Sequence, residues 1–372
     1  MYLGILVTII GGFGKKGFYH SQEIGLGKEL VAQGHRVTIY KCVAMDKARA
    51  HEQLDENYDI HYIPVRAIGV HGVMKPQELN PELDGLLSFS DTQLFLPPIE
   101  RFCRRNHIAF VPYIGIAHSA QRNAKSKVMD VFFKLGTLRI YKRMPVIAKS
   151  AAVQEELSAL GVKDCTIAPV GLDASRLKLD YADHDRAALR AKYGYTPEDV
   201  VVSFVGRLKP EKHPVEVVEL LGSIREKKNF KLLMVGEGYL QEKIEEKIAE
   251  LGLSDRVQMI ERVPYEQMWE IHWIADYNLN ICTREIFGMA LMESVYYRSS
   301  AAALHAPGPD AILTGMAGHC LCDTMEQVAD WLCGERPDDA LLAESSRLLL
   351  ERFSWRICAD RFVQLTQEEN HA

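Results

Sequence analysis

The chain has 372 residues, of which 47% are hydrophobic and 25% charged, and its formal net charge is −6. This composition is typical of a globular protein and excludes a disordered chain or one that binds nucleic acid through overall positive charge. The length exceeds one ordinary core, so two domains are expected. The eight cysteines include no Cys-x-x-Cys pair, which predicts free thiols rather than a disulfide framework or a metal site.

The first half of the chain alternates short apolar runs with amphipathic segments. Strands are predicted at residues 3–10, 36–40, 60–65, 86–89, 108–114, 146–149 and 166–168. Helices are predicted at residues 20–33, 92–106, 126–141 and 151–160. The alternation is typical of a parallel sheet with helices on both faces. The first apolar run is too short to span a bilayer and lacks the basic flank of a signal peptide, so a cytoplasmic location is expected.

A polar, charge-rich stretch at residues 173–199 interrupts this rhythm, which then resumes. Strands are predicted at residues 200–205, 231–235, 257–260, 277–281 and 301–304, and helices at 215–227, 240–251, 265–274, 289–297 and 355–367. We therefore expect an N-terminal domain at 1–175, a C-terminal domain at 176–352, and a helical segment at 353–372 that packs back towards the first domain. Ligands of open parallel sheets bind at the carboxyl ends of strands, which favours the cleft between the domains as the site.

The run Glu285-Ile-Phe-Gly288-Met-Ala-Leu-Met-Glu293 places two carboxylates on either side of a glycine, between an apolar strand and an apolar helix. A helix rises about 1.5 Å per residue, so the carboxylates would lie on the order of 10–12 Å apart, with free helix N–H groups between them. That spacing fits a nucleotide-diphosphate sugar along the helix start, where its phosphates would meet the N–H groups and the positive end of the helix dipole. The alternative is an ordinary strand–turn–helix with two surface glutamates.

Three further segments place glycines or cations after predicted strands: Gly11-Gly12-Phe13-Gly14, Val205-Gly206-Arg207-Leu208-Lys209-Pro210-Glu211-Lys212 and Val235-Gly236-Glu237-Gly238. With these four segments the chain resembles the retaining nucleotide-sugar glycosyltransferases of family 4. The resemblance covers nearly the whole length and is strongest in the second half. It implies an α/β fold of the GT-B type, in which two facing Rossmann-like, doubly wound domains with parallel sheets enclose an interdomain cleft.

The resemblance also implies a role for each matched position. Arg207 and Lys212 would contact the donor diphosphate, although a solvated basic loop is the alternative. Glu285 would contact the sugar hydroxyls, and His118 would lie near the reacting sugar unless it is merely a polar surface residue. The remaining donor-binding positions are Gly12, Gly14, Gly236, Arg262, Val263, Phe287, Gly288, Met289, Ala290, Leu291 and Glu293. Among these, residues 287–291 would act through the main chain, Glu293 would hold the ribose, and Arg262 and Val263 match the base-contacting loop by position.

Residues 298–310 depart from the family pattern. The family usually has Gly-x-Pro-Val-Val after the helix that carries the second glutamate, and this chain has neither that glycine nor that proline. The segment His305-Ala-Pro-Gly-Pro-Asp310 replaces the usual glycine-rich turn. The departure concerns the wall of the donor pocket and not the phosphate site.

Transfer with retention requires that the leaving diphosphate be stabilised and that the acceptor hydroxyl reach the same face of the sugar. Arg207, Lys212 and the helix that starts near Gly288 would stabilise the developing charge, and the leaving phosphate could itself accept the acceptor proton. Covalent attack by Glu285, as in retaining hydrolases, is the alternative route. No cofactor and no metal ion are expected, and Asp183-His-Asp185 is interpreted as a solvated part of the connector. A UDP-sugar is the expected donor.

Residues Arg122–Lys149 form a strongly basic segment with aromatic and apolar side chains interleaved. A basic, aromatic-bearing helix in an acidic protein can dock on the anionic inner face of a cell membrane, where lipid-linked acceptors reside. The alternative is a helix that packs Phe132 and Leu135 on the sheet and leaves its lysines in water. The basic residues are Arg122, Lys125, Lys127, Lys134, Arg139, Lys142, Arg143 and Lys149.

The sequence therefore predicts a hexosyltransferase that uses a nucleotide sugar and a glycan or lipid-linked acceptor in cell-envelope polysaccharide, exopolysaccharide or glycolipid synthesis, with no nucleic-acid partner. One alternative is a nucleotide-sugar 2-epimerase of GT-B fold, which needs acid–base carboxylates and histidines in the cleft. The two glutamates and the Gly-Arg…Lys loop favour the transferase. A second alternative is a catalytically degenerate subunit that binds nucleotide sugar, for which the altered residues 298–310 leave room.

Overall fold

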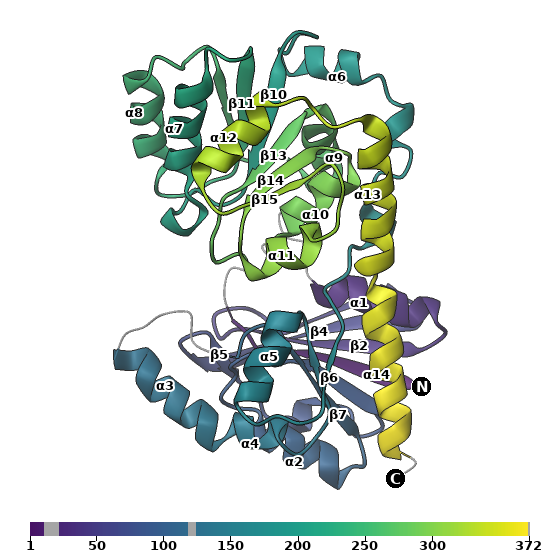
Figure 1. Cartoon of the computed structure of the whole chain (residues 1–372). Coiled ribbons are helices and arrows are strands. Elements are labelled where there is room, and N and C mark those ends of the chain that lie inside the picture. The colour runs from purple at the N-terminus through teal and green to yellow at the C-terminus, as the bar shows by residue number, and fades with distance from the viewer. Residues whose placement is uncertain (11–21, 118–123, 371–372) are drawn as a thin grey trace. The chain divides into compact units, whose positions relative to one another are not determined.

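The computed structural model describes residues 1–10, 22–117 and 124–370, with the backbone alone at residues 124–127 and 174. The chain divides into two compact units, each with its own sheet (Figure 1). Unit 1 comprises Met1–Asp173 and Phe353–Ala372, and unit 2 comprises Ala174–Arg352.

The sheet of unit 1 has the strand order β3-β4-β2-β1-β6-β7-β8-β9, and β5 pairs with β4. The strands are β1 (Tyr2–Val7), β2 (Arg36–Ala44), β3 (Ala50–Asp55), β4 (Tyr58–Ile68), β5 (His71–Val73), β6 (Gly85–Phe89), β7 (Ala109–Ile114), β8 (Val146–Ala148) and β9 (Cys165–Ile167). The pairs are parallel except β3–β4 and β4–β5, which are antiparallel. The buried apolar runs of β1, β6 and β7 explain why these strands form the middle of the sheet.

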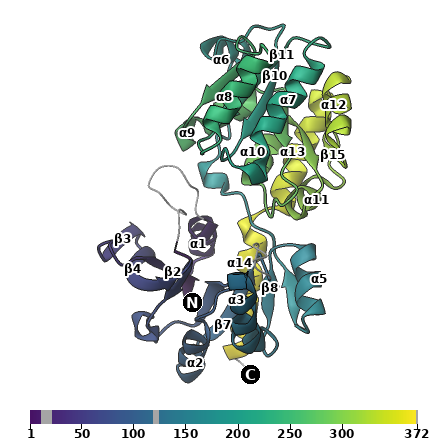
Figure 2. The ribbon, with the colours of Figure 1, turned by 90° about the vertical axis from the view of Figure 1, so that its left-hand side faces the viewer.

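The helices of unit 1 are α1 (Gln22–Ala32), α2 (Pro97–Arg105), α3 (Ala124–Leu135), α4 (Thr137–Tyr141), α5 (Ala151–Ala159) and the C-terminal α14 (Trp355–Asn370), with a 3-10 turn at Pro76–Glu78. Helix α14 packs against α1, as Figures 1 and 2 both show. A Cβ added at Gly25 of α1 would lie 2.4 Å from Nε1 of Trp355, so a side chain at this position would push the two helices apart. The N–H of Leu172 donates to the carbonyl oxygen of Phe353 at 2.8 Å and ties the start of this return segment to unit 1.

The sheet of unit 2 is parallel, with the order β12-β11-β10-β13-β14-β15. The strands are β10 (Val200–Val205), β11 (Phe230–Val235), β12 (Val257–Ile260), β13 (Tyr277–Asn280), β14 (Ser300–Leu304) and β15 (Cys320–Cys322). The chain runs from β10 outward to β12, then returns to pair β13 with the other side of β10. The strand order therefore reverses between β10 and β13, and such a reversal is where open parallel sheets bind their ligands.

Helices cover both faces of the sheet in unit 2. They are α6 (Arg186–Lys192), α7 (Pro214–Ile224), α8 (Gln241–Glu250), α9 (Tyr265–Ile274), α10 (Met289–Tyr296), α11 (Pro307–Leu313), α12 (Met325–Cys333) and α13 (Asp339–Arg352), with 3-10 turns at Ala174–Arg176, Tyr181–Asp183 and Pro210–Lys212. One core joins the strands to α7, α8 and α12, and another joins them to α9. Asp185 is the N-cap of α6 and accepts hydrogen bonds from the N–H groups of Ala187 and Ala188 at 2.9 and 3.1 Å, so this carboxylate has a structural role.

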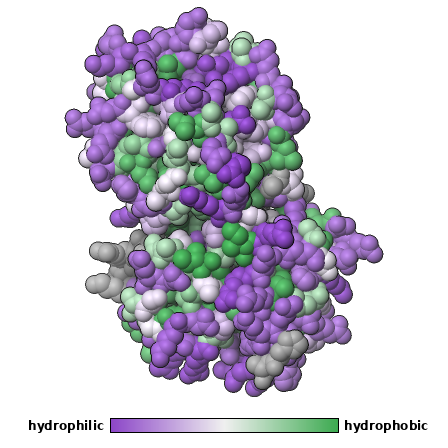
Figure 3. Space-filling view, turned by 45° about the vertical axis from the view of Figure 1, so that its right-hand side comes forward, coloured by the Kyte–Doolittle hydropathy of each residue, from purple (hydrophilic) through white to green (hydrophobic). Residues whose placement is uncertain are grey.

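From β6 to β14, each predicted strand lies within one residue of an observed one. The predicted helix at 126–141 is wrong as a single element, because the chain breaks at Gly136 into α3 and α4. The sequence interpretation also missed β3 and β5, whose residues are exposed or too few to give a periodic apolar signal. Among the described residues, no helix combines the length and apolar character needed to cross a membrane. On the face in Figure 3, hydrophilic side chains predominate and hydrophobic ones form small groups.

Candidate functional site

Two loops meet where the strand order of unit 2 reverses. The loop after β10 begins at Gly206 and carries Arg207 and Lys212, while the loop after β13 carries Glu285 and ends at Gly288. Because β10 and β13 are parallel neighbours, both loops leave the same edge of the sheet. The structure thus brings together two motifs that lie more than 70 residues apart in the chain.

Lys212 and Glu285 form an ion pair between these loops, with their Nζ and Oε2 atoms in direct contact. Both side chains are largely buried, with 22% of Lys212 and 16% of Glu285 exposed. They line a narrow cavity of about 20 Å³ together with Asn280 and Ala290. This volume has room for about one water molecule, so a ligand at this position would have to separate the pair. Arg207 is exposed on the same loop.

Gly288 is the N-cap of α10 and has a φ of 71°, a left-handed conformation that strains other residues. A Cβ here would lie 3.3 Å from Nδ2 of Asn280 and 3.4 Å from Cγ of Glu285. Gly288 has no side chain that could cover the helix start, where the first N–H groups have no intrahelical partner. The start of α10 therefore lies next to the side chain of Glu285, and Gly288 itself is buried. Met289 and Ala290 are half-buried and the side chain of Leu291 is fully buried.

The altered segment 305–310 supports the Glu285 loop. The N–H of Gly308 in α11 donates to the carbonyl oxygen of Glu285 at 2.8 Å. A Cβ at Gly308 would lie 2.8 Å from backbone atoms of Phe287, so this close approach requires a glycine. The substituted turn thus still supplies a glycine that fixes the backbone between Glu285 and Gly288.

The turn after β11 packs beneath the Arg207 loop. A Cβ at Gly236 would lie 1.8 Å from the carbonyl oxygen of Gly206, and the N–H of Leu208 donates to the carbonyl oxygen of Glu237 at 2.9 Å. Arg262, after β12, is exposed and its Nε donates to Glu237 Oε2 at 2.8 Å. Val263 packs against the core of α9 and the sheet. These residues support the loop and lie at the same strand-end edge.

Glu293 opens onto a different and larger cavity, of about 340 Å³. The hydroxyl of Tyr265 donates to Glu293 Oε1 at 3.3 Å, and Nε2 of the buried His272 lies 3.4 Å from Oε2. The two glutamates of the motif therefore line two different cavities. The cavity is lined by Ser175, Arg176, Leu177, Lys178, Tyr265, Glu266, Met268, Trp269, Glu293 and Tyr297.

Sequence reasoning missed the aromatic and basic lining of this cavity. The guanidinium of Arg176 lies 4.2 Å from the ring centre of Tyr265, and the N–H of Lys178 donates to the hydroxyl of Tyr297 at 2.9 Å. Burial raises the pKa of both tyrosines, so both hydroxyls stay protonated at neutral pH. Tyr265 and Trp269 lie four residues apart on one helix, a spacing that could have marked a shared face. Arg176 and Lys178 gave no such signal, since they belong to the polar connector.

The three predicted site residues of unit 1, Gly12, Gly14 and His118, all lie outside the described residues. The described backbone before His118 is held by Asp91, a residue that sequence reasoning missed. Its Oδ1 accepts hydrogen bonds from the N–H groups of Gly115 and Ile116 at 2.6 and 3.2 Å.

The structure corrects both interpretations of the basic segment of unit 1 at particular residues. Lys149 is buried and lies 4.7 Å from the ring centres of Phe89 and Tyr113, so it is wrong to count it with the surface cations. Burial lowers its pKa. The alternative that packs Phe132 and Leu135 on the sheet is also wrong, because these side chains are 61% and 56% exposed.

Instead, Phe133 is the buried aromatic of α3. Val128, Val131, Phe132 and Leu135 follow the helical spacing of one face and are all more than half exposed. The charged side chains of Lys134, Arg139, Lys142 and Arg143 are also exposed. Arg122, Lys125 and Lys127 have no described side chains.

Part of unit 2 is similar to a known protein family. Residues 185–320 match the family model described as "Glycosyl transferases group 1". This range contains Arg207, Lys212, Gly236, Arg262 and the whole run from Glu285 to Glu293.

Curated relatives are similar over part of the chain. The D-inositol 3-phosphate glycosyltransferase of Nocardia farcinica is 28% identical over 281 residues, which are 68% of this chain and 60% of that protein. The GDP-mannose-dependent alpha-(1-6)-phosphatidylinositol monomannoside mannosyltransferase of Mycolicibacterium smegmatis is 25% identical over 55% of this chain and 56% of its own length. The match spans about half the length of the curated relatives, between 42% and 60%.

Solved structures are similar over the whole chain. Sucrose-phosphate synthase from Thermosynechococcus elongatus matches with a TM-score of 0.74 at 16% identity, covering 99% of this chain and 98% of that one. Anabaena Alr3699/HepE, solved in complex with UDP and glucose, matches with a TM-score of 0.66 at 16% identity and the same coverage. The prediction of an α/β fold of the GT-B type with parallel sheets is confirmed.

Proposed function

We propose that this protein is a retaining glycosyltransferase that moves a hexose from a nucleotide-diphosphate sugar to a glycan or lipid-linked acceptor, without a catalytic metal ion. The observation that carries this proposal is the ion pair of Lys212 and Glu285 at the strand reversal, beside the uncapped start of α10. A cation, a carboxylate and helix N–H groups at one strand-end edge suit a diphosphate bonded to a sugar.

In the proposed reaction, the donor diphosphate would replace Glu285 as the partner of Lys212. Glu285 would then be free to accept hydrogen bonds from sugar hydroxyls. As the anomeric bond breaks, negative charge grows on the distal phosphate, where Lys212, Arg207 and the N–H groups after Gly288 would stabilise it. The phosphate oxygen that leaves would accept the acceptor proton, so retention needs no side-chain nucleophile.

The cavity at Glu293 would receive the nucleoside. A buried carboxylate can accept hydrogen bonds from ribose hydroxyls, and its bond to Tyr265 fixes its orientation. The aromatic rings of Tyr265, Trp269 and Tyr297 provide much of the apolar lining, together with Leu177 and Met268. A UDP-sugar is the first donor to test, and the structure of Alr3699/HepE was solved with UDP-glucose.

The acceptor side would face an anionic membrane through α3 and α4. The apolar face of α3 is exposed, and the exposed cations Lys134, Arg139, Lys142 and Arg143 complement anionic headgroups. This arrangement suits a lipid-linked acceptor in cell-envelope glycan, exopolysaccharide or glycolipid synthesis. It supports the membrane interpretation over a helix whose apolar face lies on the sheet.

The test begins with thermal shift measurements of the whole chain with UDP-, GDP- and ADP-sugars. A ligand at a hundred times its Kd stabilises the protein by about 2.7 kcal/mol, which ranks the bases clearly. The preferred donor is then incubated with and without acceptors in excess EDTA, and the anomeric configuration of the product is read by NMR. We expect transfer or slow donor hydrolysis with retention, unaffected by EDTA.

Other outcomes would contradict the proposal in distinguishable ways. A 2-epimer formed from donor alone would identify an epimerase. Nucleotide-sugar binding with neither transfer nor hydrolysis would identify a degenerate binding subunit. A melting temperature that no nucleotide sugar raises, together with no turnover, would remove the donor site altogether.

A further inference from the structure

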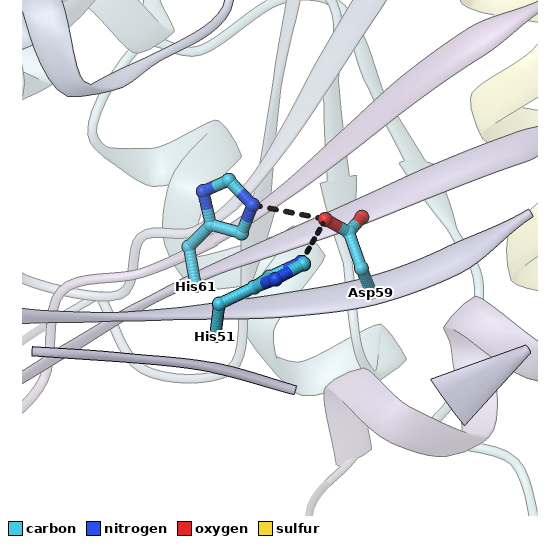
Figure 4. A group of neighbouring side chains, drawn as sticks. All are labelled: His51, Asp59 and His61. Atoms are coloured by element: carbon cyan, nitrogen blue, oxygen red, sulfur yellow. Dashed lines mark hydrogen bonds and ion pairs between the residues drawn. The ribbon is translucent and has the colours of Figure 1, made fainter. Parts of the chain in front are cut away.

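A compact cluster of two histidines and one aspartate lies on the β3–β4 hairpin at the edge of the sheet in unit 1 (Figure 4). His51 on β3 is directly opposite His61 on β4, and Asp59 lies two residues before His61 on the same strand. Period-two alternation puts Asp59 and His61 on the same face of β4. Nε2 of His51 and Nε2 of His61 each lie 2.9 Å from Oδ2 of Asp59, so a single carboxylate oxygen faces both imidazoles.

The carboxylate of Asp59 is also hydrogen-bonded to the neighbouring strand β2. The hydroxyl of Thr38, on the neighbouring strand β2, donates to Asp59 Oδ1 at 2.6 Å, and the Tyr2 hydroxyl lies 3.0 Å from the same Thr38 oxygen. Oδ1 of Asp59 is therefore occupied by Thr38, while Oδ2 is directed at the two histidines.

We propose that His51, Asp59 and His61 form a binding site for one divalent transition-metal ion of the Zn²⁺ class. The donor set, two imidazole nitrogens and one carboxylate oxygen, is one that zinc and other first-row ions favour. The three donor atoms all lie within 4.8 Å of one another. The hydrogen bond from Thr38 is the outer support that metal-binding carboxylates commonly have.

The distances fit this assignment after a small adjustment. Metal–nitrogen and metal–oxygen bonds of about 2.0–2.2 Å put neighbouring tetrahedral ligands about 3.3–3.5 Å apart. The observed 2.9 Å between each Nε2 and Oδ2 is a hydrogen-bond distance, so each imidazole would move by roughly half an ångström when an ion replaces the proton between them. Each ring would then present its Nε2 lone pair and carry its proton on Nδ1. The side chains of His51 and His61 are 54% and 42% exposed, which leaves room for water as a further ligand.

A metal ion at this site would connect the edge strand β3 to β4. Every residue of β3 is exposed, and β3 is the terminal strand of the sheet order. An ion shared by His51 on β3 and by Asp59 and His61 on β4 would crosslink the two strands and, through Thr38, fix them to β2. Metal binding of this kind stabilises the folded state because the unfolded chain does not hold the three ligands together. The inference concerns unit 1 alone and does not depend on the proposed transferase activity.

The experiment uses the full chain without a histidine tag, stripped of metal with chelator. Zn²⁺ is titrated by calorimetry into the wild type and into a His51→Ala/His61→Ala variant. We expect the wild type to bind one more Zn²⁺ than the variant and to gain melting temperature at saturation, while the variant gains less. Thr38→Val, which removes only the outer hydrogen bond, should weaken this extra site by about tenfold. Equal stoichiometry in wild type and double variant would overturn the proposal.

Two control variants test whether the extra Zn²⁺ could bind at another exposed histidine. His107→Asn removes an exposed histidine of unit 1 at a position of positive φ that asparagine tolerates. His305→Ala removes a histidine of unit 2 that pairs with Asp310 Oδ1 at 2.6 Å. Both controls should keep the extra ion. If either loses it, the assignment to the hairpin is wrong.

A measurement on the wild type alone covers the case in which the double variant does not fold. X-ray absorption at the zinc edge of a one-to-one complex should show imidazole scattering and no sulfur shell. Sulfur ligands would instead place the ion at the thiols of Cys320 and Cys322, whose Sγ atoms lie 3.1 Å apart, and would refute the hairpin site.

Discussion

Lys212 and Glu285 neutralise each other across the carboxyl ends of β10 and β13, at the point where the strand order of unit 2 reverses. The ammonium group of Lys212 is therefore already paired with a carboxylate. An anion that binds there would compete with Glu285 for Lys212, or would share the three N–H donors of its ammonium group with that carboxylate. The position of Glu285 is therefore expected to depend on whether an anion is bound at Lys212.

The first prediction concerns catalysis by the two cations. Lys212→Met and Arg207→Met should each lower kcat by about 10²–10³-fold, while the Kd for nucleotide changes much less, because the charge they stabilise develops mainly in the transition state. Lys243→Met, at an exposed position of α8, serves as the matched control. The measurement is donor turnover alongside nucleotide titration. A variant of either cation that retains the wild-type kcat would refute this role.

The second prediction separates backbone strain from ligand binding at Gly288. Gly288→Ala and Gly252→Ala both place a side chain at positive φ, 71° and 63°, and each should lower the free energy of unfolding by about 1–2 kcal/mol. A Cβ at Gly252 meets nothing within 4 Å, whereas one at Gly288 lies 3.3 Å from Asn280 Nδ2. Only Gly288→Ala should therefore weaken donor binding. Denaturant titration and donor titration on both variants check this, and equal donor affinities would contradict it.

The third prediction concerns the nucleoside cavity. Glu293→Gln should raise the donor KM by about tenfold or more and lower kcat much less, because a buried, charged acceptor of hydrogen bonds is lost away from the reacting atoms. Glu266→Gln is the control, since Glu266 lines the same cavity but is exposed. Steady-state kinetics with varied donor distinguish the two. A fall in kcat at unchanged KM would place Glu293 at the chemistry instead.

The fourth prediction concerns stability at acid pH. Burial lowers the pKa of His319 to about 4, and its Nδ1 accepts the N–H of Ala301 at 2.9 Å. Between about pH 6.5 and pH 4 the unfolded chain binds a proton at this residue that the folded chain does not, so stability falls as pH falls through this window. The stability is fully present above pH 6.5, and the loss is at most about 3 kcal/mol.

Replacement of His319 removes this proton difference. In His319→Gln the free energy of unfolding should depend less steeply on pH between 6.5 and 4 than in the wild type. The exposed His107→Asn variant should keep the wild-type slope. Denaturant titrations at several pH values give the slopes, and identical slopes in wild type and His319→Gln would contradict the assignment.

The fifth prediction compares two adjacent aromatics of α3. Phe132→Ser should reduce binding to vesicles that contain anionic lipid and leave stability nearly unchanged, because this side chain is 61% exposed. Phe133→Ala should cost about 3–5 kcal/mol of stability, because Phe133 is 3% exposed and packs in the core. Co-sedimentation with vesicles of varied anionic content tests the first effect. Binding that ignores anionic lipid would remove the membrane interpretation.

Local patterns in the sequence determined most of the strands and the residue types at the candidate donor site. Strands β10, β11 and β14 were predictable because buried parallel strands are largely apolar runs bounded by turns. Gly288 was predictable as a turn because its place between strand and helix favours a residue that tolerates positive φ. The residues at the site, Lys212, Glu285 and Glu293, were singled out by spacing and by resemblance before their surroundings were known.

Tertiary structure decided which of these residues meet and which side chains face solvent. Lys212 pairs with Glu285, and His51 with Asp59 and His61, because strand pairing sets neighbours that sequence distance does not reveal. Adjacent residues of a helix point about 100° apart, so Phe132 and Phe133 cannot both face the core. The break at Gly136 and the packing of α3 decided that Phe133 is the buried one. Periodicity is a local property of the sequence. Which strands pair, and which side of a helix faces the core, depends on the free energy of the whole chain, and no single segment reveals it.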